Sequence, residues 1–148
     1  MSRSNYSDEC DDNLAAGRWR GAVHSAINGK RGQKLLTEIL AAFDAMPVKE
    51  LGADALVTAE GQYCTLGVLG AVRGIDMTVI DPENYNAVAK AFDVAPALVR
   101  EIVWLNDDWI IAERFIDGKW TYNPELPTDR FNRMREWVLS QCKEVGEK

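Results

Sequence analysis

Histidine and cysteine are scarce in this chain of 148 residues, and their scarcity limits the chemistry that it can perform. His24 is the sole imidazole, so a histidine-based metal centre is not expected, and any Ser–His or Cys–His dyad would depend on this one residue. The three cysteines are an odd number at wide spacing, which fits neither a disulfide framework nor a paired C-x-x-C metal site. We therefore expect reduced thiols, no metal and no cofactor.

Long apolar runs are also absent. No run approaches the roughly 18 residues that a bilayer crossing needs, and the polar residues 1–12 contain no apolar segment typical of a secretion signal. A content of 47% hydrophobic and 27% charged residues is ordinary for a globular protein and indicates neither disorder nor a membrane protein. We expect a cytoplasmic protein without a membrane partner.

Positive charge is in deficit overall but is concentrated in one segment. The net charge of -6 and the pI of about 4.8 do not favour indiscriminate coating of nucleic acid. Residues 18–34 nevertheless carry five cations and no acid. Such a cluster is either a solvated face or a docking surface for an acidic partner. The five residues are Arg18, Arg20, Lys30, Arg31 and Lys34.

The dominant pattern in the sequence is apolar residues at the three- and four-residue spacing of a helix. It predicts helices over residues 12–28, 32–46, 65–73, 81–92, 95–106 and 128–142. Residues 48–63 fit either a short hairpin or an irregular loop. The Asp117–Gly118 pair between aromatic and β-branched residues predicts a β-hairpin near residues 109–122.

These elements predict a mainly α fold. We expect residues 1–148 to form a single globular domain of about six helices, with residues 1–11 and 143–148 flexible. The apolar helix 65–73 should lie at its centre, with Gly67 and Gly70 admitting another helix at close range. The hairpin should pack on the surface of the helices.

Residues 85–104 fit the frame of a helix-turn-helix. Ala89 is the small residue that this frame requires, whereas Asp93 stands where glycine is commonest. The positions expected to face a DNA groove include Arg100, Glu101 and Trp104, a weak set for reading bases because one cation is opposed by one acid. A structural helical corner is favoured over a DNA-binding unit, which stays an alternative through Arg100 and Trp104.

Cys64 precedes the expected helix 65–73, a position that stabilises a thiolate. A cysteine-dependent enzyme is therefore a second alternative. A buried cysteine acting as a small hydrophobe is favoured, because no spacing pairs it with His24. Similarly, Asn106, Asp107 and Asp108 fit a cap and turn better than a cation site.

Trp109 and Trp120 belong to the predicted hairpin. Large amphipathic rings on a short hairpin serve either as lids on a core or as anchors of a protein interface. We count both residues, with the five cations above, as candidate partner-binding residues.

Several short motifs together resemble a family of small uncharacterised proteins encoded by bacteriophages and prophages. They are residues 1–6, 18–23, 29–33, Cys64-x-x-Gly67, Asn106–Asp107 and residues 133–138. The likeness covers most of the chain and departs from it at residues 108–123, where the family leads us to expect a shorter connection. It implies a phage-borne setting in a bacterial host cell and carries over no catalytic residue. We therefore expect a non-enzymatic, phage-encoded binding protein that engages a host or phage macromolecule, most simply a protein. Inhibition of a host defence or regulatory complex is one expected effect of this binding.

Overall fold

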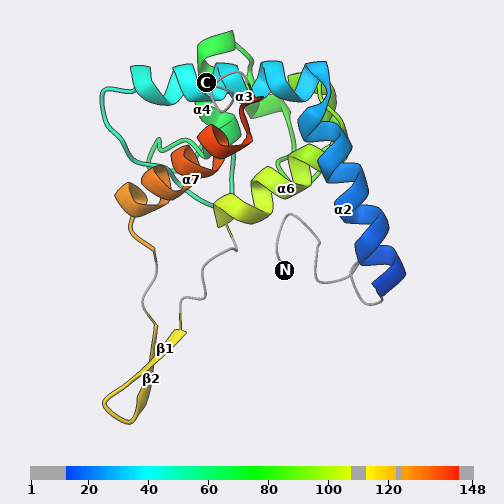
Figure 1. Cartoon of the computed structure of the whole chain (residues 1–148). Coiled ribbons are helices and arrows are strands. Elements are labelled where there is room, and N and C mark those ends of the chain that lie inside the picture. Colours follow the sequence, from blue (N-terminus) through cyan, green and yellow to red (C-terminus); the bar gives the residue numbers. More distant parts are fainter. Residues whose placement is uncertain (1–12, 108–112, 123–124, 144–148) are drawn as a thin grey trace.

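The computed structural model describes residues 13–107, 113–122 and 125–143 (Figure 1). This part of the chain is mainly helical, with six α-helices, as the sequence predicts. The elements are α2 (Asn13–Asn28), α3 (Lys30–Ala45), α4 (Thr65–Arg73), the 3₁₀-helix η1 (Met77–Val79), α5 (Tyr85–Phe92), α6 (Pro96–Asp107), β1 (Glu113–Ile116), β2 (Lys119–Tyr122) and α7 (Pro127–Gln141).

Helix α3 forms because its apolar residues recur every three or four positions. Leu35, Leu36, Ile39 and Phe43 are buried along one face, and the helix ends before Pro47 as predicted. Figure 1 shows α3 running across the molecule, with α7 and α4 against it and α2 descending from its first turn. Together with α6, which packs on α2, α4 and α5, these helices enclose the core.

Helix α4 is central for most of its length. Its residues from Thr65 to Gly70 are buried, but Ala71 and Val72 are exposed, so the expectation of a uniformly buried helix holds for the first two turns alone. We expected another helix to pack closely at Gly67, but the neighbour found there is the backbone of a connecting segment. A Cβ atom at Gly67 would overlap the carbonyl oxygen of Leu56, which lies in the connection between α3 and α4.

That connection contains one antiparallel bridge, between Val57 and Tyr63. The amide of Thr58 donates to the carbonyl of Gln62 at 2.8 Å, and the amide of Gln62 donates back to the Thr58 hydroxyl at 3.0 Å. The segment that fitted either a hairpin or a loop is thus a tight turn within a longer connection.

Helix α5 starts later than expected. The Asp81 carboxylate accepts from the amide of Glu83 at 2.9 Å in a turn, and Asn84 is the residue that caps the helix, accepting from the amide of Ala87 at 3.1 Å. At the other end Asp93 adopts the left-handed conformation with φ 58°. The two-helix corner predicted over residues 85–104 therefore exists, and an aspartate occupies the position where glycine is commonest.

The junction between α6 and α7 is fixed by Arg133. Its guanidinium donates to both carboxylate oxygens of Glu125 at 2.8 and 2.9 Å and to the carbonyl of Leu105 at 2.6 Å. The end of α6 and the start of α7 are therefore held together by one side chain.

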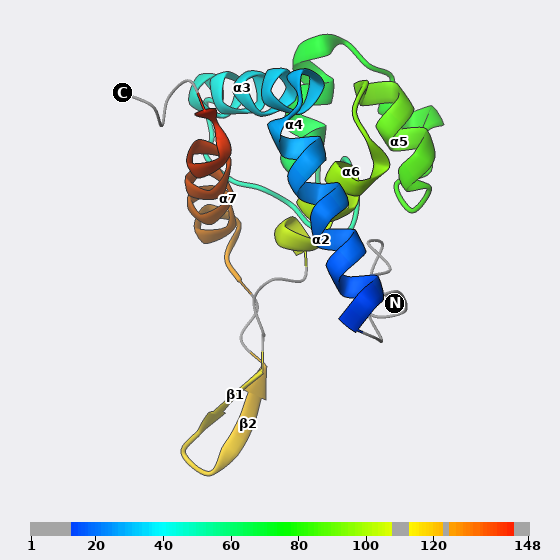
Figure 2. The same cartoon turned by 45° about the vertical axis from the view of Figure 1, so that its right-hand side comes forward.

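Strands β1 and β2 pair antiparallel around Asp117 and Gly118, both of which have positive φ. Figures 1 and 2 show these strands standing apart from the helices, so the expectation that they pack on the helical surface is wrong. The Asp117–Gly118 turn sets this pairing through local backbone geometry, whereas packing on the helices depends on contacts between distant segments. Residues 109–112 of the predicted hairpin lie outside the described residues.

Candidate functional site

An apolar groove with a volume of about 390 Å³ lies between the end of α3 and α4 in the described structure. Three segments build it: the last turn of α3 with the residues that follow it, the tight turn before α4, and the exposed face of α4. The lining residues are Ala42, Ala45, Met46, Pro47, Val48, Glu50, Gly61, Gln62, Tyr63, Val68, Ala71 and Val72.

Two valines give this groove its exposed apolar rim. Val48 is 59% exposed and Val72 is 67% exposed, and both line the groove. Val72 is exposed because α4 carries apolar residues all round, while the core covers the helix only as far as Gly70 and leaves its last turn open. Isolated exposed valines are ordinary, but two beside an apolar recess form a continuous surface suited to a partner.

Neither valine was among the residues predicted to bind. The available signal was the apolar character of residues 65–73 on every side, which indicates either complete burial or an exposed apolar face. The sequence does not say which face the core leaves open, because that depends on where α3 and the connection after it pack.

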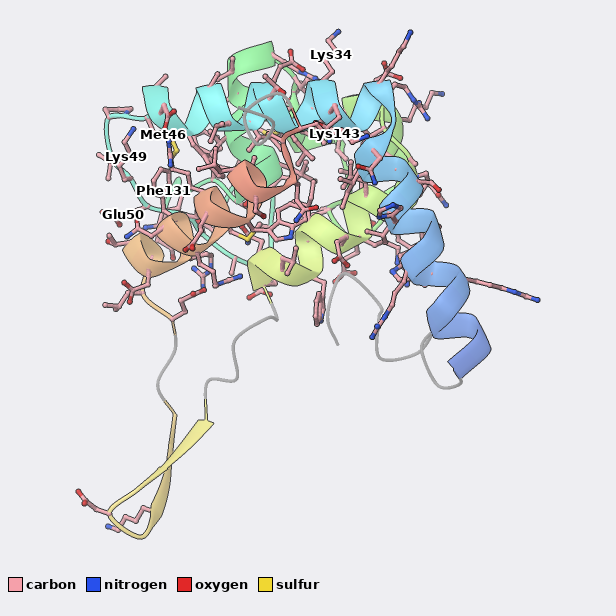
Figure 3. All side chains as sticks on the ribbon, in the orientation of Figure 1. Lys34, Met46, Lys49, Glu50, Phe131 and Lys143 are labelled. Atoms are coloured by element: carbon pink, nitrogen blue, oxygen red, sulfur yellow. The ribbon has the colours of Figure 1, made fainter. Side chains whose placement is uncertain are left out.

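The polar part of the groove is small and ordered. The side-chain amide of Gln62 donates to Oε2 of Glu50 at 3.3 Å, and the tight turn described above fixes Gln62 itself. The amide of Leu51 donates to the carbonyl of Pro127 at 3.1 Å, which anchors the chain next to Glu50. Figure 3 shows Met46 and Lys49 near the last turn of α3, and Glu50 beyond them toward the start of α7.

Glu50 is the one charged residue among those that line the groove. The neighbouring Lys49 is directed elsewhere: its ammonium donates to the carbonyls of Phe43 and Asp44 at 2.8 Å each and lies 5.7 Å from the centre of the Phe131 ring. It therefore neutralises the negative end of α3. On the surface beside it, a hydrogen bond from Arg135 lowers the pKa of Asp44. The groove consequently presents apolar side chains and one carboxylate.

Cys64 is buried at the start of α4. It is 1% exposed, and its sulfur accepts from the amide of Gly67 at 3.4 Å as the N-cap of α4. His24 is exposed on α2, where its ring nitrogen lies 3.1 Å from the Asn28 amide nitrogen. The favoured interpretation of Cys64 as a buried small residue agrees with this position.

Asn106 is 1% exposed, and its side chain bonds to Thr65, the first residue of α4. Its carbonyl oxygen accepts from the amide and the hydroxyl of Thr65 at 3.1 and 2.9 Å, and its amide donates to the carbonyl of Gly52 at 3.0 Å and to Asp107 at 2.7 Å. The same Asp107 oxygen accepts from the amide of Asp54 at 3.1 Å. This network is structural. Within the residues that the structure describes, no three histidine, cysteine or acidic side chains group as metal ligands, and Asp108 lies outside them.

The position of Arg100 differs from the one that the DNA-binding alternative expects. The side chain that was expected to face a groove of DNA is 2% exposed and lies between the rings of Trp19 and Tyr85, 4.4 Å from each ring centre. Trp104, the second residue of that alternative, is half-buried and packs against the core. Arg100 is buried because two aromatic faces replace its hydration with cation–π contacts. It cannot reach a phosphate or a base.

The basic segment of the sequence lies on α2 and the first turns of α3, where all five predicted cations are exposed. Arg31 pairs with the exposed Asp93 at 3.3 Å. Figure 3 shows Lys34 at this end of α3, away from the groove. The role of these cations in binding stays a prediction.

Two further candidate partner-binding residues are the tryptophans of the predicted hairpin. Trp109 lies outside the described residues. The backbone of Trp120 pairs with Phe115 in the hairpin, and its side chain lies outside the description.

In comparisons with protein families, curated proteins and solved structures, no match to this chain was found. In the parts of the chain that are described, no helix combines the length and the apolar character that a bilayer crossing requires.

Proposed function

We propose that this chain is a non-enzymatic binding protein that engages a protein partner at the apolar groove. The observation that carries the proposal is the pair of exposed valines, Val48 and Val72, beside a recess of about 390 Å³. Covering such a surface removes apolar area from water, which stabilises a complex by roughly 25 cal/mol per Å² before the costs of association.

The biological setting that we propose is the one implied by the resemblance of several sequence motifs to phage-encoded proteins. In that setting the partner is a host or phage protein, and the effect of binding is inhibition of a host defence or regulatory complex. The acidic surface of the whole chain, with a net charge of -6, supports a protein over a nucleic acid as the partner.

The two alternative functions, DNA recognition and cysteine catalysis, each depended on a residue that is buried in the described structure. DNA recognition depended on Arg100, which is buried between two rings. Cysteine catalysis depended on Cys64, whose sulfur is occupied as a helix cap in the interior. Neither alternative has a specific observation in its favour.

Affinity capture from a bacterial lysate with quantitative mass spectrometry tests the proposal. Val72→Glu should lose the captured partner, because it places a charge on the apolar rim. Val79→Glu is the matched control, since Val79 is 78% exposed and does not line the groove. Both variants should melt at the temperature of the wild type, because neither side chain is part of the core.

The other surfaces suggested by the sequence are tested in the same capture. A double variant with Arg31 and Lys34 changed to Glu removes the basic segment, and Trp120→Ala alters the hairpin. If one of these loses the partner while Val72→Glu retains it, the groove is not the binding site and the proposal is wrong.

A further inference from the structure

We propose that the groove accepts an apolar segment of the partner that carries one lysine or arginine, and that this cation pairs with Glu50. This inference rests on the proposed function, because it specifies the chemistry of the partner at the same groove.

Charge complementarity is the first argument. Glu50 is the one charged lining residue, it is half-buried, and the side-chain amide of Gln62 holds one of its carboxylate oxygens. A partner that covers the groove with purely apolar groups would strip water from this carboxylate without replacing it. A buried and uncompensated charge is costly, so a cation on the partner is favoured over a neutral group and strongly favoured over an acid.

The neighbouring cations of the chain are already engaged, which is the second argument. Lys49 lies on the carbonyls at the end of α3, and Arg135 pairs with Asp44 at 2.8 Å. At the end of α4, Arg73 pairs with Glu38. These cations have partners of their own, so the groove keeps a negative charge for a ligand.

The extent of the apolar surface favours a polypeptide segment over a small molecule. Val48 and Val72 line the groove and are largely exposed, so they extend its apolar surface to the outer edge. A ligand that only filled the recess would leave most of this rim in water. An amphipathic segment with apolar residues three and four positions apart would fill the recess and cover the rim together.

The probe is a set of acetylated, amidated peptides of about 14 residues, a length that gives several helical turns. Leucines spaced three and four apart form one face, and a single variable position beside that face is Lys, Gln or Glu. Binding is measured by fluorescence anisotropy, and methyl NMR signals of Val48 and Val72 report whether the groove is occupied. Val79→Glu again serves as the control for a distant exposed valine.

For the wild type we expect the Lys peptide to bind roughly threefold to tenfold more tightly than the Gln peptide, with the Glu peptide weakest. Glu50→Gln keeps the shape of the side chain and should abolish the difference between the Lys and Gln peptides. Glu50→Lys should invert the order in favour of the Glu peptide. The preference for Lys should weaken as salt rises past about 0.15 M.

Three outcomes would overturn the proposal in distinguishable ways. If Val72→Glu loses every peptide but Glu50→Gln keeps the preference for Lys, the cation does not pair with Glu50 while the groove remains the binding site. If no peptide shifts the Val48 and Val72 signals at millimolar concentration, the groove does not take such a segment. If sedimentation shows a wild-type dimer that Val72→Glu dissociates, the groove is covered by a second copy of the chain.

Discussion

Replacing Asn106 by alanine should destabilise the fold more than its single side chain suggests. Asn106 links three separate parts of the chain: the start of α4 through Thr65, the connection after α3 through Gly52, and its own helix through Asp107. All of these contacts lie in or beside the interior, where water cannot readily replace a lost partner.

The magnitude follows from the groups that alanine leaves behind. The amide of Thr65 at the start of a helix and the carbonyl of Gly52 each lose a partner in the interior, at about 1–3 kcal/mol per group. Asp107 keeps its hydrogen bond from Asp54, so its loss is smaller. We expect the free energy of unfolding to fall by about 3–5 kcal/mol, a large fraction of the total stability of an ordinary domain.

Urea denaturation followed by circular dichroism measures this loss. With a slope of about 2 kcal/mol per molar urea, the midpoint should fall by about 2 M. Asn132→Ala is the control, because Asn132 is exposed on α7, where alanine is the better helix former and should leave the midpoint unchanged or slightly raised. A loss below about 1 kcal/mol for Asn106→Ala would show that the network contributes little and would refute the reasoning.

Three further predictions concern separate features. Gly67→Ala should prevent folding or lower the melting temperature sharply, because a methyl group there meets a backbone carbonyl, whereas Gly70→Ala meets the end of a flexible side chain and should lower it less. The carboxyl signal of Asp44 in NMR should titrate below the usual range of an aspartate, and Arg135→Gln should return its pKa to that range. Because the pKa of Asp44 is depressed in the folded state, the stability from this pair is present above the unfolded-state pKa. It is lost as the pH falls through the folded-state pKa. In thiol labelling read by mass spectrometry, Cys64 should react only after denaturant is added, and rapid labelling of the native protein would contradict its burial.

The helices were predictable because their signals are local. The apolar stripe of α3 and the proline after it fix that helix, and the predicted helix 128–142 matches α7 to within one residue at each end. Boundaries that depend on competing caps were less predictable. Asp81 and Asn84 are both good capping residues, and the one used depends on how the chain leaves η1.

The sites were less predictable, because they depend on contacts between distant segments. The environment of Arg100 is made by Trp19 and Tyr85, and no local pattern indicates that an arginine on a predicted outer face will be enclosed by two rings. The groove has the same origin. Val48 and Val72 become neighbours of one recess only when α3, its connection and α4 are assembled.

The guanidinium of Arg133 has a consequence for how this protein can vary. By joining the carbonyl of Leu105 to the carboxylate of Glu125, it brings the two ends of the intervening segment together independently of that segment's length. The cost in closure entropy of a longer loop between such fixed ends grows slowly, by about 0.6 kcal/mol for each doubling. The chain can therefore gain, lose or exchange residues between 108 and 124 with little change to the helices, which makes this the natural position for grafting a foreign hairpin or a reporter peptide.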